Sequence, residues 1–157
     1  MRELHRVTER IYEELQQLGA EVAGVRPLFE KLATRDPDEV ELRAAALTLH
    51  GFYNGVEAVF LFIAKHFDHH VPDGIRWHRQ LLDQMNTATD RRARVIDQQA
   101  YDMLLEYLSF RHMVRHTYPG MLDWDRFRDI ARDLLSAHAR VDQAVRRFVT
   151  AAPTDDK

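Results

Sequence analysis

The chain has 157 residues, of which 45% are hydrophobic and 30% charged, and its formal net charge at pH 7 is −3. This length favours one domain that buries roughly 68–70% of its unfolded surface without covalent cross-links. The sequence has no cysteine, which excludes disulfides and thiolate metal sites and fits a cytoplasmic location. No apolar stretch of the kind found in signal peptides opens the chain. With this net charge, any contact with nucleic acid has to come from a local basic patch.

Two long helices are expected in the first part of the chain. Apolar residues recur every three or four positions over Leu4–Leu32, which predicts an amphipathic helix. Pro27 should kink this helix, because proline removes a backbone donor and crowds the preceding turn. A second helix is predicted to start with Asp36 as N-cap, Pro37 in the first helical position and Glu39 completing a capping box.

The second helix should continue for about 30 residues, or ~45 Å. Its centre, Ala44–Ala64, is apolar nearly all round, so the helix is either central in a bundle or shared with a partner. A membrane span is not expected, because His50, Asn54 and Glu57 interrupt the stretch. The purely apolar run, Ala58–Ala64, is also far shorter than the ~20 residues that a span needs.

The rest of the chain is also predicted to be helical. A loop over residues 66–74 precedes a short helix from Ile75 or Trp77 to about Asn86, and long helices follow over about 93–115 and from Asp123 to about Phe148. Residues 1–150 should form a single domain and residues 151–157 a frayed tail. Because no strand pattern appears, the predicted fold class is all-α, an up-and-down bundle of long helices with one short extra helix.

Two clusters of titratable residues lie between these helices. The loop histidines His66, His69 and His70 invite a metal-site interpretation. We favour exposed loop histidines, because no Glu-x-x-His pattern accompanies them, and we predict no metal. His78, in the short helix, could face a cleft. Farther along, three arginines form a small basic cluster that either contacts phosphates or pairs with neighbouring carboxylates: Arg91, Arg92 and Arg94, with Asp90 and Asp97 as the possible partners.

The stretch richest in chemistry is Arg111–Tyr118, which holds two arginines, two histidines and a tyrosine in eight residues. It ends the long helix, because Pro119 stops the helix and pushes the residue before it out of the α region. Arg111 can hold a phosphate with a planar fork of donors, and His116 can move a proton near neutral pH. Arginine and histidine without a carboxylate cluster suit phosphodiester chemistry that needs no metal.

The spacing of Arg111 and His116 poses a geometric problem. The two residues are five positions apart, so on a regular helix they diverge by about 140°. Either the last turn unwinds at His116, or a two-fold partner brings a second arginine and histidine to the same cleft. A purely structural interpretation also remains, because arginine and histidine at a helix C-terminus complement the macrodipole.

Arginine at 111, histidine at 116 and tyrosine at 118 resemble the R-x4-H-x-Y motif of HEPN-domain toxins, the HepT-like ribonucleases. His112 stands where that family has a polar residue, most often Asn. With the all-helical pattern, the resemblance extends over nearly the whole chain. Tyr53-Asn54-Gly55-Val56-Glu57 is similar to the family's helix that places an acidic residue opposite the motif. A structural interpretation stands beside this one: Glu57 pairs with a core arginine, for which Arg111 is an obvious candidate.

The resemblance implies a metal-independent endoribonuclease toxin that cleaves RNA such as tRNA or mRNA. Arg111 would neutralise the phosphate oxygens, His116 would transfer protons, and His112 would support it or act as second proton carrier, with Glu57 and Asn54 in supporting roles. The resemblance also implies a homodimer, or a higher even oligomer, with the two motifs facing each other. A cognate MNT-type nucleotidyltransferase antitoxin would transfer AMP to Tyr118. No cofactor is expected.

Two other classes of function stay open. One is a catalytically silent HEPN protein that only binds a nucleotide or a partner. The intact motif argues against it, and an RNA cleavage assay separates the two. The other is a metal-dependent helical bundle of the DinB type, which uses three histidines and would retain metal when purified without chelator.

Overall fold

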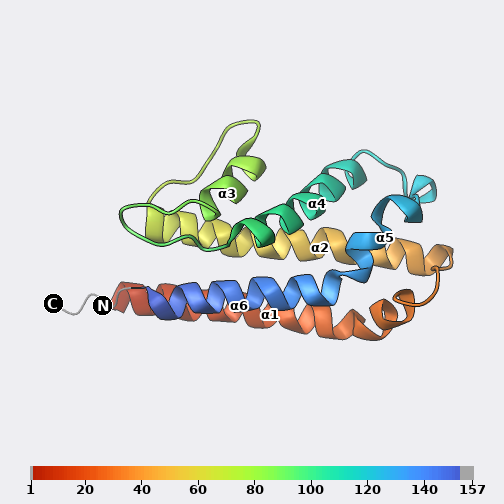
Figure 1. The fold of residues 1–157 in the computed structure, drawn as a ribbon, viewed down its shortest axis with the longest axis horizontal. Coiled ribbons are helices and arrows are strands. Elements are labelled where there is room, and N and C mark those ends of the chain that lie inside the picture. The colour runs from red at the N-terminus through yellow and green to blue at the C-terminus, as the bar shows by residue number, and fades with distance from the viewer. Residues whose placement is uncertain (1, 153–157) are drawn as a thin grey trace.

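The computed structural model describes residues 2–152, which form six α-helices: α1 (Arg2–Leu32), α2 (Glu39–Ile63), α3 (Trp77–Met85), α4 (Gln98–Val114), α5 (Trp124–Arg132) and α6 (Leu134–Ala151) (Figure 1). A π-helical turn, Ala64–Asp68, extends α2, and a 3-10 turn, Pro119–Met121, precedes α5. These residues contain no strand. The predicted all-α bundle is confirmed, and α3 is the short extra helix.

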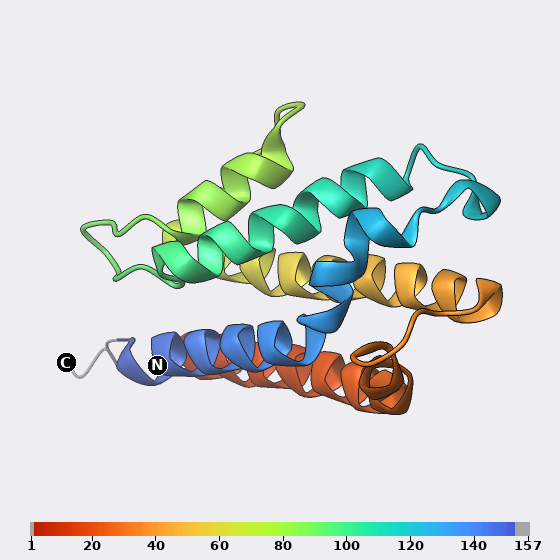
Figure 2. The same cartoon turned by 45° about the vertical axis from the view of Figure 1, so that its right-hand side comes forward.

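The central helix is α2, which packs against all five other helices. Its inward side chains are almost fully buried, among them Leu49, Val56 and Ile63. α1 and α6 lie side by side along one edge, with the start of α1 and the end of α6 at the same end of the molecule (Figures 1 and 2). α3 and α4 cover α2 on the other side. The apolar composition of the second helix is therefore that of a helix with neighbours on several sides.

One described helix is long and apolar enough to cross a membrane by length and composition alone. It is α2 with its π-helical turn, Glu39–Asp68, which has a window of mean hydropathy 1.3. Half of that window is buried inside the bundle. Burial of this kind is what the core helix of a packed bundle requires.

The predicted start of α2 is wrong by two residues. Asp38, not Asp36, is the N-cap, and its side chain accepts a hydrogen bond from the Glu41 backbone N–H at 2.8 Å. The Glu41 carboxylate accepts in return from the Asp38 backbone N–H, which completes the capping box. Asp36 is used elsewhere, because the Trp124 indole N–H donates to it at 3.1 Å. Asp36 thus contacts a distant helix, and Asp38 is the N-cap of α2.

The fourth helix also begins later than predicted, at Gln98. Before it, the backbone N–H groups of Val95 and Ile96 both donate to the carbonyl of Met85, at 2.9 and 3.2 Å. These bonds tie the segment to the end of α3 and leave it outside a helix. Asp97 then caps α4 by accepting from the Ala100 N–H at 2.8 Å.

The single last helix predicted from the sequence is two helices, α5 and α6, which meet at Asp133. The buried Tyr107 hydroxyl of α4 donates to the Ile130 carbonyl at 2.7 Å. In an unbroken helix that carbonyl would accept from the N–H of Leu134. Arg132 donates to the Leu32 carbonyl at 3.0 Å, which fixes the end of α5 to the end of α1. At its other end, α6 continues through Ala151, and the rest of the predicted tail, residues 153–157, lies outside the described residues.

Pro27 lies inside α1 and does not end it: the helix continues to Leu32.

Candidate active site

The C-terminal end of α4 presents the Arg111–Tyr118 stretch. The α-helix ends at Val114, and the next backbone bonds span three residues: His116 N–H donates to the Met113 carbonyl at 3.1 Å and Thr117 N–H to the Val114 carbonyl at 3.2 Å. The Thr117 hydroxyl also donates to the Met113 carbonyl, at 2.8 Å. The last turn therefore tightens and then unwinds at His116, which is the first of the two geometries considered from the sequence.

Arg111 is held by the central helix. Its Nε donates to the Asn54 side-chain oxygen at 2.8 Å, which joins α4 to α2 across 57 positions of sequence. No carboxylate of residues 2–152 forms a salt bridge with Arg111. The guanidinium is thus oriented through one nitrogen, while its charge is not neutralised by a neighbouring acid. This is the state that an anion-binding arginine needs.

The two histidines of the motif lie next to each other at the surface. The ring centroids of His112 and His116 are 5.4 Å apart and the rings are inclined by 72°, an edge-to-face contact. Both side chains are exposed. No hydrogen bond joins either imidazole to Arg111 within the described part of the chain. One protomer therefore provides a histidine pair and a held arginine, but not a direct arginine–histidine contact.

Tyr118 follows in extended backbone, with φ −67° and ψ 142°, directly before Pro119. Its side chain is 78% exposed, so the hydroxyl is accessible to another macromolecule. The conformation is the one that a residue before proline prefers.

The expected partner of Glu57 is wrong. Glu57 is 6% exposed, and its Oε2 lies 2.7 Å from Nδ1 of His78 on α3. Asn54 and Glu57 share one side of α2, but the first reaches α4 and the second reaches α3. A buried carboxylate needs a donor or cation at close range, and His78 supplies one. Glu57 therefore fixes α3 and does not orient Arg111.

His50 is a candidate residue that the sequence analysis considered only as a polar interruption of an apolar helix. It lies one turn before Asn54 on α2, and its buried Nδ1 has no hydrogen-bond partner among the described protein atoms. Burial lowers the pKa of His50 below its ordinary value, and the charges of Arg111 and Arg115 lower it further. The lowered pKa favours the neutral form of this imidazole near Arg111. Its spacing of four from Asn54 was the available signal.

The loop histidines do not form a cluster. Across residues 2–152, no three histidine, aspartate or glutamate side chains are arranged to hold a metal ion. The His66 ring packs on Phe62, with centroids 4.4 Å apart, and His69 adopts the left-handed conformation with φ 53°. The third loop histidine, His70, is exposed.

Comparison of the sequence with curated proteins and with solved structures found no match. A family model described as HepT-like protein matches residues 44–152, which is more than half of the chain and contains every candidate residue named above. This family indicates a HEPN-type toxin of the ribonuclease class, with RNA as substrate and a toxin–antitoxin partnership in general terms. The chain belongs to the family of HepT-like proteins.

Proposed function

We propose that this protein is a metal-independent endoribonuclease, the toxin of a HEPN/MNT toxin–antitoxin pair, and that it acts in the cytoplasm. The observation that supports this most is the hydrogen bond from Arg111 to Asn54. It orients the guanidinium through Nε and leaves the two outer nitrogens for a phosphate. The exposed imidazoles of His112 and His116 follow on the same helix end.

The proposed reaction is an in-line transfer within the RNA. One imidazole removes the proton of the ribose 2′-hydroxyl, and the 2′-oxygen forms a bond to phosphorus as the bond to the 5′-oxygen breaks. The other imidazole protonates the departing 5′-oxygen. Arg111 stabilises the charge that builds on the non-bridging oxygens. We assign the main proton transfer to His116, because it lies where the helix has unwound, and the supporting role to His112, one turn before it.

We further propose that the active form is a homodimer with the two motifs facing each other. Six large apolar side chains are exposed among residues 2–152: Val40, Leu47, Val71, Ile75, Tyr118 and Met121. The bond from Trp124 to Asp36 joins the segment after the motif to the start of α2, so Val40, Tyr118 and Met121 lie at one end of the molecule. Burying these side chains against a second copy would stabilise a dimer and bring the Arg111 and His116 of the second copy close to those of the first. Sedimentation as a monomer at micromolar concentration would contradict this part of the proposal.

Tyr118 is the proposed point of control. A cognate nucleotidyltransferase would transfer AMP from ATP to its exposed hydroxyl: the tyrosine oxygen bonds to the α-phosphorus, the hydroxyl proton is lost and pyrophosphate leaves. The adenylate adds a negative charge and bulk close to the motif, so it would occupy the anion-binding groups and repel RNA.

The test of the activity is the chemistry of the product ends. RNA incubated with the purified protein in EDTA should yield fragments with a 2′,3′-cyclic phosphate at one end and a 5′-hydroxyl at the other. Fragments with a 5′-phosphate, or cleavage that stops in EDTA, would refute the proposed mechanism.

A further inference from the structure

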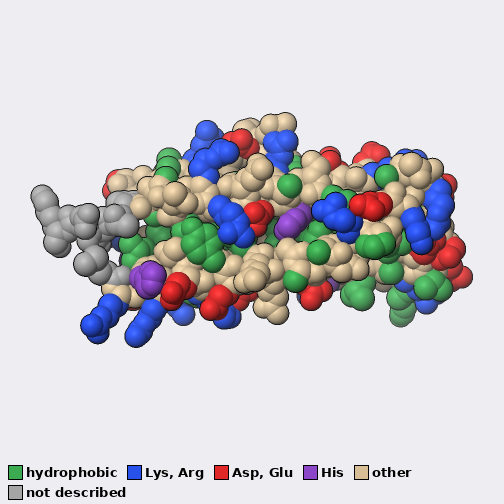
Figure 3. Space-filling view, turned by 90° about the horizontal axis from the view of Figure 1, so that it is seen from below, with side chains coloured by type: hydrophobic (Ala, Val, Ile, Leu, Met, Phe, Trp, Pro, Cys, Tyr) green, Lys and Arg blue, Asp and Glu red, His purple; other side chains and the backbone are tan. Residues whose placement is uncertain are grey.

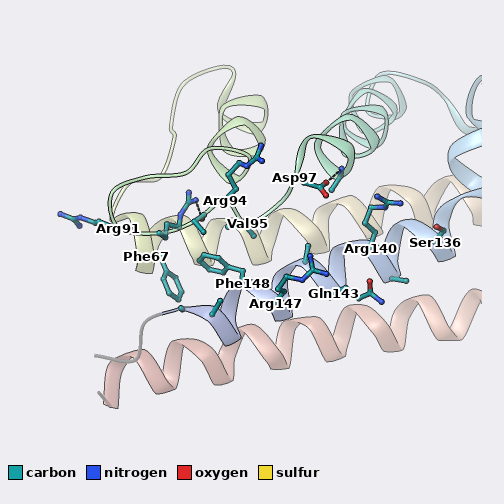
Figure 4. A pocket seen from close by; sticks show the side chains of 17 residues that line it. Phe67, Arg91, Arg94, Val95, Asp97, Ser136, Arg140, Gln143, Arg147 and Phe148 are labelled. Carbon is teal, nitrogen blue, oxygen red and sulfur yellow. Dashed lines mark hydrogen bonds between the residues drawn. The ribbon is translucent and has the colours of Figure 1, made fainter. Parts of the chain in front are cut away.

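A second feature lies at the opposite end of α4 from the motif. An open groove of about 730 Å³ runs between the segment 86–97 and one face of α6 (Figure 4). Five arginines line it: Arg91, Arg92 and Arg94 from the segment, and Arg140 and Arg147 from α6. Phe67 and Phe148 also line it. We call this the arginine groove. Arg92 is buried, and in Figure 4 Arg91 points away from the groove, so Arg94, Arg140 and Arg147 supply its free charge.

The charge of the arginine groove is not neutralised within the described residues. Apart from Arg92, none of its arginines forms a salt bridge there, whereas the adjacent Arg146 pairs with Asp142 at 2.8 Å. The one acid among the lining residues is Asp97, whose carboxylate caps α4. The chain as a whole is acidic, and on the face shown in Figure 3 basic and acidic side chains are interspersed. The arginine groove is therefore a local positive site, of the kind that nucleic-acid binding by an acidic protein requires.

One wall of the groove is held rigidly by the fifth lining arginine, Arg92. Arg92, whose side chain is 3% exposed, pairs with Asp68 at 2.5 Å and donates to the carbonyls of Thr87, Gln84 and Ala93. Of the two alternatives considered for Arg91, Arg92 and Arg94, pairing with Asp90 or Asp97 does not occur in residues 2–152. Because the neighbours of Arg94 are fixed, little conformational entropy is lost when this wall meets a ligand.

The spacing of the arginines favours an extended ligand. Arg140 and Arg147 are seven residues apart on the same face of α6, which is two turns or about 10 Å. A compact phosphate group would meet one of them, whereas a chain with successive phosphates can meet both. The rings of Phe67 and Phe148 pack edge to face with centroids 5.2 Å apart, and because Phe148 is buried, Phe67 is the ring open to a ligand. Charges spaced along a groove with aromatic side chains are typical of single-stranded nucleic-acid sites.

We propose that the arginine groove binds the phosphate backbone of single-stranded RNA, as a second contact for the substrate of the motif. This inference rests on the proposed function for the identity of the substrate. Ala100 of α4 lines the groove, and Arg111 follows eleven residues later, about 16 Å along the helix. A strand held in the groove and running beside α4 would thus reach the motif within a few nucleotides.

The test measures binding and not cleavage, so the proposed catalysis can fail without affecting it. A fluorescent single-stranded RNA of 20 nucleotides is titrated with full-length protein carrying His116→Ala, and anisotropy is recorded from 50 to 200 mM salt. Adding Arg140→Gln and Arg147→Gln should weaken binding about tenfold or more at 50 mM salt. The plot of log K against log salt has a negative slope, and its magnitude should decrease by about 1.4, since each phosphate contact on a single strand contributes about 0.7.

The matched control removes the same charge elsewhere. The control variant carries Arg10→Gln and Arg26→Gln on α1, where both arginines pair with glutamates at the surface. These two changes should leave the salt slope unchanged. Equal losses in both double variants would reduce the effect to net charge and overturn the proposal. An unchanged slope in the groove variant, or an absence of RNA binding by the parent, would also overturn it. A second assay measures binding to anionic phosphatidylglycerol vesicles. If the groove variant loses vesicle binding but keeps RNA binding, the groove is a membrane-binding surface and the proposal is wrong. Circular dichroism should show all variants folded.

Discussion

Replacing Arg92 by Met should cost more stability than any other single arginine replacement near the arginine groove. The guanidinium forms two bonds with the Asp68 carboxylate, at 2.5 and 2.7 Å, and three with backbone carbonyls. The Asp68 side chain is only 6% exposed, so the replacement leaves a buried carboxylate with no cation. Breaking one partner of a buried ion pair costs about 3–5 kcal/mol. For a chain of this length that corresponds to a melting temperature lower by roughly 6–20 °C.

Urea unfolding followed by circular dichroism measures this loss directly. Arg91→Met is the matched control, because its side chain is exposed and should change the free energy of unfolding by less than about 0.5 kcal/mol. Replacing Arg92 and Asp68 together by Met and Leu should recover most of the loss, since no unpaired charge remains. A loss below about 1 kcal/mol for Arg92→Met, or a double variant less stable than the single one, would refute the reasoning.

Three further predictions concern the motif and the start of α2. Asn54→Ala should lower RNA cleavage about tenfold while the melting temperature stays nearly unchanged, because it frees a surface arginine from one charged hydrogen bond; full activity would show that Asn54 does not position Arg111. Coexpression with the antitoxin should add adenylate to the peptide containing Tyr118, and Tyr118→Phe should abolish this addition; adenylate on another residue would contradict the assignment. The bond from Arg35 lowers the pKa of Glu41 from 4.5 to about 2, so its stabilising effect is present above pH 4.5 and is lost as the pH falls to about 2. Glu41→Gln should therefore be less stable than the parent at pH 7 and equal to it near pH 2, and a constant difference in urea unfolding would count against the pair.

The pattern of apolar residues predicted the class of fold and most helices, because helical periodicity is local information. What it missed depends on contacts between distant segments. Asp36 met every requirement of an N-cap, but the indole of Trp124 binds it instead. The break between α5 and α6 follows from a hydroxyl of Tyr107, on another helix, at the carbonyl of Ile130. Neither contact leaves a trace in the local sequence.

Some features of the candidate site could likewise be predicted from the sequence, and others depend on contacts between helices. The motif, its place at a helix end and the unwinding at His116 follow from the residues and from the proline after Tyr118. The partner of Glu57 does not, because Asn54 and Glu57 share a side of α2 and only the packing of α3 decides that His78 takes the carboxylate. His50 was missed because its spacing of four from Asn54 was the one signal in the sequence, and the two arginines that lower its pKa, Arg111 and Arg115, lie at the end of another helix.

The most direct test of the central proposal is the rate of RNA cleavage in EDTA by the parent and by His116→Ala. A group that transfers a proton in the reaction contributes about 10²–10⁴-fold, so the variant should be slower by that factor while its melting temperature is unchanged. The parent should keep its full rate in the chelator. Undiminished cleavage by His116→Ala, or complete loss of the parent's activity in EDTA, would contradict the account.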